Sequence, residues 1–388
     1  MRRAEPRLAD FAHGEVFFAA RCVRLPEALE HHFGLAQRRA KARQARRDPG
    51  ERRRISGARA VSRAQIYRLP DGLRREIGEA VANAEINRYP DPTAPALVKR
   101  LRKVMGIAPE YDVLLGNGSD EIIHIIVQSV ARPGAVVLAP RPCFFMFSQY
   151  AQFAGLRYVG VLLNRDFTLE PGAFLRALAE HRPAVVFIDY PNNPSGNLFS
   201  DEAIAQIIAA APGLVVIDEA YHPFARKTFM TRLAEFPNLV VMRTLSKLGL
   251  AGIRLGYSVG RPEWIREFDK VRPPYNVSML THVVAERVLA HYDVLDAQAR
   301  SINAERERLG GELRKLPDVT VFPSDANFIL VRVPDATRVF EGMRRRGVLV
   351  KNLHTGVPLL DHCVRVTIGT PEENRRCLAA FAEALAEG

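Results

Sequence analysis

The sequence predicts an α/β fold in which helices cover both faces of a mostly parallel sheet. Between residues 112 and 243, short and almost wholly apolar segments alternate with segments of helical spacing. Strands that are buried on both faces read as continuous apolar runs, and parallel strands need a crossover, usually a helix, between them. After about residue 275 the strands become fewer and the helices longer, which predicts a second, smaller α+β domain.

Six strands are expected in the first region: Asp112–Leu115, Ala135–Ala139, Arg157–Leu162, Ala184–Asp189, Leu214–Asp218 and Leu239–Arg243. Helical spacing falls between them at Ser119–Val130, Phe144–Phe153, Pro171–Glu180 and Ser200–Ala210. In open α/β sheets, ligands bind outside the carboxyl ends of the strands. The residues that follow these strands are therefore the candidates for a site.

The C-terminal region is expected to begin with one or two long helices over Ser278–Arg314. Strands should follow at Val319–Phe322, Phe328–Val333, Val348–Val350 and Val364–Ile368, with helices at Ala336–Arg346 and from Pro371. The expected division is a leader over 1–66, an N-terminal arm over 67–90, a large domain over 91–275 and a small domain over 276–388.

Charge and hydropathy exclude several classes of protein. The net charge is +12, but residues 1–60 hold 15 of the 55 Lys and Arg and only 7 of the 43 Asp and Glu. The rest of the chain is nearly balanced, and the basic run Arg38–Arg54 lacks interleaved aromatic residues, so nucleic acid is not an expected partner. No run reaches the roughly 18 to 20 apolar residues of a membrane span. We expect a cytoplasmic protein without a membrane partner.

Residues 1–66 are expected to be disordered, or a non-native leader, because their bias to Arg and Ala resembles unselected translation of GC-rich DNA. The cysteines at positions 22, 143, 363 and 377 form no CxxC pair, and the ten histidines form no HExxH motif. Free thiols and no metal site are therefore predicted.

Two motifs follow predicted strands and offer polar groups to a ligand. Gly116–Glu121 (GNGSDE) opens a helix, where free N–H groups and the helix dipole favour an anion, although an ordinary glycine turn reads the same way. It is neither GxGxxG nor a Walker loop, so neither NAD nor ATP is indicated. Pro191–Gly196 (PNNPSG) could be a turn, but the Asn193 amide could also bind a ring oxygen.

Two further motifs carry ionisable groups at strand ends. Asp218, which opens DEAY, would be costly to bury unless a cation such as a protonated ring nitrogen pairs with it, and Tyr221 could reach the same ligand. In TLSKLGLAGIRLG, Lys247 lies among apolar residues, where a lysine can lose its proton and form a Schiff base with an aldehyde. Ser246 and Arg254 could bind a phosphate. Pyridoxal 5′-phosphate (PLP) is the ligand that needs all of these groups.

With these motifs, with NRYPDP at Asn87–Pro92 and with CVRVTIGT at Cys363–Thr370, the chain from Tyr67 onward resembles the fold-type I PLP-dependent aminotransferases, and among them the histidinol-phosphate aminotransferases. The resemblance implies a seven-stranded sheet and a catalytic set of Lys247, Asp218 and Tyr221. It implies that the cofactor is bound by Gly118, Ser119, Asp120, Phe144, Asn193, Asp218, Tyr221, Ser246, Lys247, Arg254 and, from a neighbouring subunit of a homodimer, Tyr89. Substrate binding is implied for Arg365, Tyr89 and Asn193.

The implied reaction is PLP-dependent transfer of the amino group of L-histidinol phosphate to 2-oxoglutarate, in histidine biosynthesis. An aromatic or other amino-acid aminotransferase is the alternative, and a PLP-dependent lyase, a decarboxylase or an impaired homologue is the second. The sequence departs from the family at Ala60–Ile66, where an Asn-Glu-Asn/Cys-Pro stretch is usual. That departure bears on closure over the substrate more than on cofactor binding.

Overall fold

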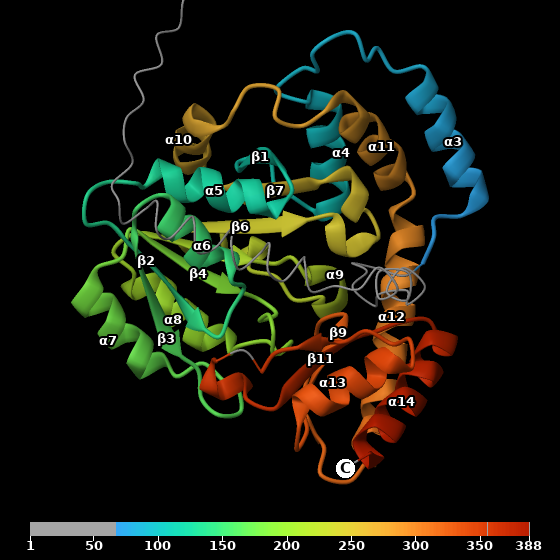
Figure 1. Cartoon of the computed structure of the whole chain (residues 1–388). Coiled ribbons are helices and arrows are strands. Elements are labelled where there is room, and N and C mark those ends of the chain that lie inside the picture. The colour runs from blue at the N-terminus through green and yellow to red at the C-terminus, as the bar shows by residue number, and fades with distance from the viewer. Residues whose placement is uncertain (1–66, 355, 388) are drawn as a thin grey trace, which may run out of the picture. The chain divides into compact units, whose positions relative to one another are not determined.

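Two β-sheets organise the part of the chain that the computed structural model describes, residues 67–354 and 356–387. The leader expected over 1–66, with Cys22, lies outside these residues. All the described residues belong to one compact unit, Gly57–Gly388. The larger sheet has the strand order β1-β7-β6-β5-β4-β2-β3 and the smaller one the order β10-β11-β9-β8 (Figure 1). Among the described helices, none combines the length and the apolar character that a membrane crossing requires.

The larger sheet is mostly parallel, as predicted. Its strands are β1 (Asp112–Asn117), β2 (Val136–Arg141), β3 (Arg157–Leu162), β4 (Val185–Asp189), β5 (Leu214–Asp218), β6 (Leu239–Thr244) and β7 (Leu255–Gly260). The strand that sequence analysis missed is β7, which runs antiparallel to both β1 and β6. Only two single-turn 3₁₀ segments, η2 (Ser246–Leu248) and η3 (Ala251–Ile253), separate β6 from β7. A connection this short cannot cross over to a parallel neighbour, so the chain turns back.

Side chains from the two faces of this sheet belong to two separate hydrophobic cores. Val186 and Ile188 of β4 pack into one core, and the alternating residues Val185 and Phe187 pack into the other. On one side lie α5 (Ser119–Ser129), α6 (Met146–Phe153) and α10 (Pro262–Val271); on the other lie α4 (Pro95–Met105), α7 (Pro171–His181), α8 (Asp201–Ala210) and α11 (Met279–Ala290). Burial on both faces explains why the strand sequences are apolar throughout.

The smaller sheet is antiparallel throughout and consists of β8 (Thr320–Val321), β9 (Phe328–Arg332), β10 (Lys351–Asn352) and β11 (Cys363–Thr367). Its helices are α12 (Tyr292–Leu313), α13 (Ala336–Arg345) and α14 (Pro371–Ala386). The strand expected at Val348–Val350 is wrong, because these residues follow the turn that ends α13 and precede β10. Val348 and Val350 are apolar because they fill the core of this region, not because they pair with a strand.

The remaining helices are α3 (Asp71–Ala82) and the short α9 (His222–Ala225), with η1 (Met230–Arg232) and η4 (Pro358–Leu360). The long helical region expected over Ser278–Arg314 is two helices, α11 and α12, which meet at His291. In the sequence α11 follows the expected boundary at residue 275, yet it packs against α3 and α4. That boundary, and the arm over 67–90, stay predictions.

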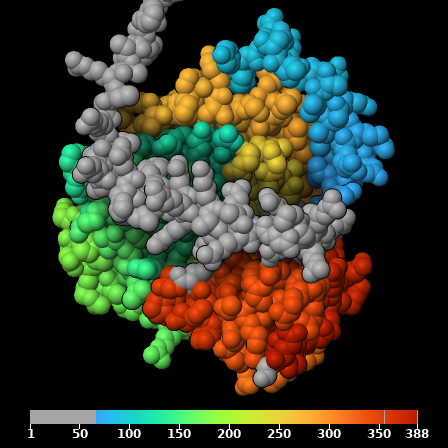
Figure 2. Space-filling view, in the orientation of Figure 1, coloured from blue at the N-terminus to red at the C-terminus, as the bar shows by residue number. Residues whose placement is uncertain are grey.

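Hydrogen bonds connect the two sheet regions directly. The backbone N–H of Asp325 donates to the carbonyl of Gly196, 2.8 Å away, and the Asp325 carboxylate accepts from the N–H of Leu198. On the face shown in Figure 2, the red C-terminal residues adjoin the green residues of the larger sheet region. Elements far apart in the sequence therefore meet where the strands of the larger sheet end.

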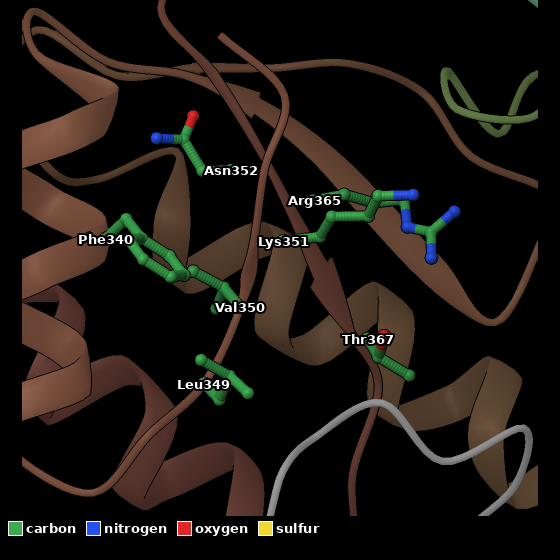
Figure 3. A pocket seen from close by; sticks show the side chains of 7 residues that line it. All are labelled: Phe340, Leu349, Val350, Lys351, Asn352, Arg365 and Thr367. Carbon is green, nitrogen blue, oxygen red and sulfur yellow. The ribbon is translucent and has the colours of Figure 1, made fainter. Parts of the chain in front are cut away.

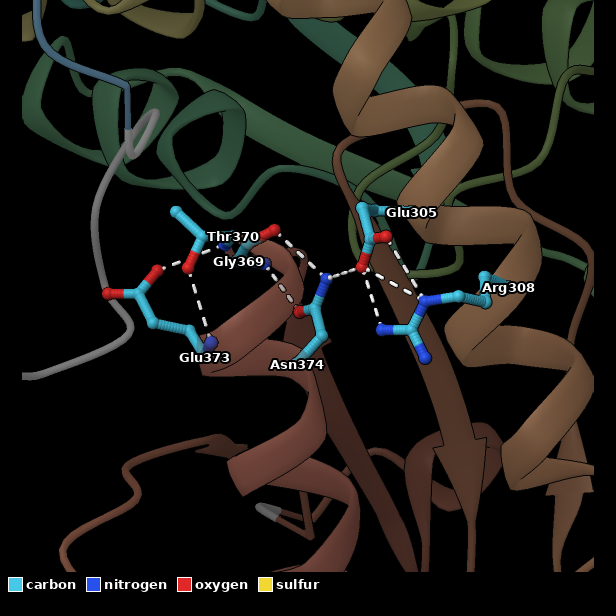
Figure 4. A network of polar contacts seen from close by, with 6 residues as sticks. All are labelled: Glu305, Arg308, Gly369, Thr370, Glu373 and Asn374. Carbon is cyan, nitrogen blue, oxygen red and sulfur yellow. Dashed lines mark hydrogen bonds and ion pairs between the residues drawn. The ribbon is translucent and has the colours of Figure 1, made fainter.

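A capping network holds the segment after β11 against two helices (Figure 4). Thr370 and Glu373 form a reciprocal capping box at the start of α14. The Asn374 side chain accepts the N–H of Gly369 and donates both to the Gly369 carbonyl and to the Glu305 carboxylate on α12. This network satisfies the free backbone groups of the helix start and fixes where β11 ends.

The backbone of β7 passes so close to the start of α5 that Gly256 has no room for a side chain. A Cβ at Gly256 would lie 2.5 Å from the Gly118 carbonyl carbon and from the Ser119 nitrogen. We expect Gly256→Ala to lower the free energy of unfolding by about 1–3 kcal/mol, because backbone atoms must move. Chemical denaturation measures this.

Gly252→Ala is the matched control, since a Cβ there meets nothing within 4 Å. Equal stability losses in the two variants would contradict the close approach.

Candidate active site

One pocket gathers most of the predicted site residues, at the carboxyl ends of β4, β5 and β6 and the start of α5. Its lining consists of Ser119, Asp120, Phe144, Asp189, Asn193, Asp218, Ala220, Tyr221, Thr244, Ser246, Lys247, Ala251 and Arg254. These positions come from five separate stretches of the sequence. The sheet brings them together because its parallel strands end at one edge.

Lys247 lies in η2, directly after β6, and its side chain is partly buried. Its Nζ lies 5.4 Å from the centre of the Tyr221 ring, near enough for a cation–π contact. Leu248 and Leu250 beside it are buried in the core of the larger sheet region. The amine is therefore held at the edge of the apolar interior and faces the pocket.

Asp218 ends β5 and is 4% exposed. Its Oδ1 accepts the N–H of Ala220 at 3.0 Å. Burial raises the pKa of this carboxyl to about 7, and the N–H of Ala220 and the charge of Lys247 offset only part of that rise. A cationic ligand group at Asp218 would therefore relieve a real electrostatic cost.

The start of α5 and the Arg254 side chain form one end of the pocket. Gly118 caps α5 with φ +82°, and a Cβ there would overlap the Arg254 guanidinium at 2.5 Å. Arg254 reaches Asp120 at 3.0 Å and the Ser246 hydroxyl at 3.4 Å. Free helix N–H groups, a hydroxyl and a guanidinium are donors suited to a phosphate.

A second arginine approaches the same region from the smaller sheet. Arg365 on β11 donates to the Asn193 side-chain oxygen at 2.6 Å. Its guanidinium stacks 4.5 Å from the Phe328 ring, which in turn packs edge-on against Tyr221. The Nε of Arg365 is buried and has no hydrogen-bond partner among the residues that the structure describes.

A pocket between α13 and the smaller sheet extends away from Arg365 (Figure 3). Figure 3 shows the Lys351 and Arg365 side chains running side by side, with Phe340 on the far side of the pocket. Partial burial, and then the charge of Arg365, lower the pKa of Lys351. Neither side chain forms an ion pair with another described residue, and two neighbouring cations favour an anionic ligand group. Lys351 was not among the predicted site residues.

Two residues need separate comment: Tyr89, whose predicted role in the site of a neighbouring subunit stays a prediction, and Asp189, which was not predicted. Tyr89 is 78% exposed, stacks on Tyr275 with ring centres 4.5 Å apart, and does not line the pocket of its own chain. Asp189 lines the pocket but was missed. It ends the apolar run of β4 as Asp218 ends that of β5, and the two residues are paired in register, so the sequence did carry a signal for it.

The cysteines of the described residues, Cys143, Cys363 and Cys377, are free thiols. Burial raises the pKa of Cys377 to about 12. A thiol that stays protonated is a poor nucleophile, which agrees with their interpretation as structural residues.

Comparisons with known proteins agree with this arrangement. The sequence matches the family Aminotransferase class I and II over residues 60–381. It is 55% identical to histidinol-phosphate aminotransferase 1 of Burkholderia lata over 320 residues, which are 82% of this chain and 90% of that protein. The corresponding enzyme of Ralstonia nicotianae is 56% identical over 324 residues, covering 82% and 87% of the two chains.

Among solved structures, histidinol-phosphate aminotransferase from Sinorhizobium meliloti in complex with pyridoxal-5′-phosphate superposes with a TM-score of 0.76. It is 26% identical, and the match covers 84% of this chain and 90% of that one. The fold is therefore fold-type I, with a mostly parallel seven-stranded sheet and a smaller antiparallel one. On the family match and the identity to its relatives, the chain belongs to the class I and II aminotransferases.

Proposed function

We propose that this aminotransferase transfers the amino group of L-histidinol phosphate to 2-oxoglutarate, in histidine biosynthesis, with PLP as its cofactor. The proposal rests mainly on one observation: Lys247, Asp218 and Arg254 line the same pocket. The names of the relatives support the choice of amine. The products would be imidazole acetol phosphate and L-glutamate.

The residues of the pocket fit PLP. Burial raises the pKa of Asp218, and a protonated ring nitrogen beside it would stabilise the ionised carboxylate. Gly118 leaves room for Arg254, and the start of α5 offers free N–H groups to a phosphate. The end of the pocket formed by the start of α5 and Arg254 also contains Ser119, Asp120 and Ser246. Phe144 would pack on the ring, and Asn193 and Tyr221 would bind its phenolic oxygen.

When bound, PLP supplies an aldehyde carbon for the amine and a ring that withdraws electrons from the substrate α-carbon. Lys247, once its amine is free, would accept the proton of that α-carbon and, as general acid, would deliver it to the cofactor carbon (C4′) that retains the amino group. The Asp218 carboxylate would stabilise a positive charge on the ring nitrogen. Tyr221 orients the Lys247 amine through their ring contact, and the apolar neighbours of η2 keep water away from it.

Arg365 and Lys351 are proposed to bind the acidic end of the substrate. The Arg365 guanidinium and the neighbouring Lys351 ammonium, which line the same pocket, together provide donors for a phosphate or a carboxylate. L-histidinol phosphate carries a phosphate and 2-oxoglutarate carries two carboxylates, so one cationic subsite serves both. Asn193 connects it with the cofactor pocket through its bond to Arg365.

The proposal includes a homodimer in the cytoplasm. Tyr89 is exposed, and Ile86 near it is 74% exposed, as residues of an unfilled contact surface would be. In the dimer, Tyr89 would reach the cofactor phosphate and the substrate in the pocket of the partner subunit. Sedimentation of the full chain, with and without Tyr89→Ala, measures the oligomeric state.

A half-reaction tests the proposed function. The full chain is loaded with PLP, L-histidinol phosphate is added without an oxo acid, and the visible absorption of the bound cofactor is followed. We expect conversion to the pyridoxamine spectrum, reversed by 2-oxoglutarate. Lys247→Ala should abolish both the initial band and turnover, whereas Lys227→Ala, an exposed lysine paired with Asp201, should change neither.

Retained turnover in Lys247→Ala would refute its role. A wild-type spectrum that responds to another amine but not to L-histidinol phosphate would show that the substrate is wrong.

From the raised pKa of Asp218 we predict how the unfolding free energy of the apoprotein depends on pH. A buried acid with a folded-state pKa of about 7 and an ordinary unfolded pKa binds more protons folded than unfolded, so its contribution to stability is lost as pH rises from about 4 to about 7. Asp218→Asn cannot ionise. Relative to wild type, apo Asp218→Asn should gain up to about 4 kcal/mol in unfolding free energy across this window.

Urea unfolding of both apoproteins at several pH values measures the difference. A stability difference that is constant with pH would contradict the buried charge. With PLP added, the order should reverse, because only wild type pairs with the ring nitrogen.

Arg365→Ala should act on the substrate more than on the cofactor. Loss of charged hydrogen bonds should raise KM for L-histidinol phosphate about 10- to 100-fold. The affinity for PLP should change little, and Lys351→Ala should raise KM less. Steady-state kinetics and PLP titration measure the two effects, with the exposed Lys270→Ala as a control. Equal damage to both constants would mean that Arg365 is structural.

A further inference from the structure

Asp189 has a buried carboxyl group that the proposed mechanism does not use. It ends β4, is 2% exposed, and lines the pocket that contains Lys247. It lies beside Asp218, its register partner on β5. Burying a carboxyl group in this position costs free energy, so we asked which contacts compensate for that cost.

The contacts of Asp189 join two separate segments of the chain. Its Oδ2 accepts the backbone N–H of Phe144 at 3.0 Å and that of Asn193 at 2.8 Å. Phe144 lies between β2 and α6, and Asn193 lies between β4 and α8, yet both line the pocket. One oxygen therefore ties together the two backbone segments that carry these side chains.

The other oxygen of Asp189, Oδ1, is buried and has no hydrogen-bond partner among the described residues. Burial raises the pKa of Asp189 well above its usual range, and the neighbouring Asp218 raises it further. Two carboxyl groups this close do not both ionise readily, so one of them keeps a proton. A neutral Asp189 leaves Asp218 as the negative charge for the ring nitrogen.

We propose that Asp189 is a positioning residue that holds the Phe144 and Asn193 segments at a fixed separation, and so sets the orientation of the cofactor in the pocket. The inference rests on the proposed use of PLP and adds to it a residue that acts through two others. The role needs an acceptor oxygen at Oδ2 and no net charge. Asparagine meets both requirements, whereas alanine has no acceptor and serine is too short to reach both N–H groups.

The test compares wild type with Asp189→Ala, Asp189→Ser and Asp189→Asn. PLP titration of the apoproteins gives the Kd, and the visible circular dichroism of bound PLP reports its orientation. Losing two hydrogen bonds to one carboxyl should raise the Kd about tenfold or more in the Ala and Ser variants and change the dichroism. Asp189→Asn should stay within about threefold of wild type in Kd, with its dichroism unchanged.

Asp166→Ala is the matched control, because this exposed carboxylate also accepts a backbone N–H, from Thr168, but lies outside the pocket. Wild-type Kd and dichroism in Asp189→Ala, even with a lower melting temperature, would overturn the proposal, since the residue would then be only structural. Asp189→Asn as impaired as Asp189→Ala would also overturn it, because charge would then be required.

If Asp189→Ala fails to fold, the Ser and Asn variants still decide between these results. Failure of the proposed function is distinguishable, because wild type itself would then fail to bind PLP or to accept L-histidinol phosphate. As long as wild type binds PLP, the comparison of the Asp189 variants with wild type remains valid, whichever amine is the substrate.

Discussion

The burial of the Asp218 carboxyl is the constraint on which the rest of the site depends. An ionised carboxylate at the end of a strand buried on both faces loses most of its hydration, and its pKa rises to about 7 as a result. The residues around it do not cancel that cost. Lys247 is close enough to lower the pKa, but its amine is engaged with the Tyr221 ring. The site is thus built to gain stability from a ligand that brings a positive charge.

The next residue, Glu219, is also a buried carboxylate, but it forms an ion pair within the chain. Glu219 accepts from Arg243 at 2.8 Å and also from the Thr228 hydroxyl and the backbone N–H of Phe229. The two neighbouring carboxyl groups of Asp218 and Glu219 therefore differ in whether the fold supplies a partner for their charge. Glu219 has its partners in the fold and anchors the strand ends, whereas Asp218 is left for the pocket.

The pocket also depends on how closely the backbone can approach itself. Gly256 and Gly118 let β7 and the start of α5 come together, and the space at Gly118 is taken by the Arg254 guanidinium. From the other side, Arg365 reaches Asn193 across the junction between the two sheets. A shift of β11 would therefore disturb Asn193, which lines the pocket.

The sequence alone determined the parallel sheet, because burial on both faces demands apolar strands, and it determined the residues at the strand ends, because ligands bind there. It also contained the strand β7, but the glycines and the serine of Leu255–Gly260 break the apolar pattern by which the other strands were recognised. Only the tertiary structure decided that Asp189 joins Phe144 to Asn193 and that Lys351 lies beside Arg365. Those pairs depend on the register of strands and on loops that meet in space, and no local pattern of residues encodes such distances.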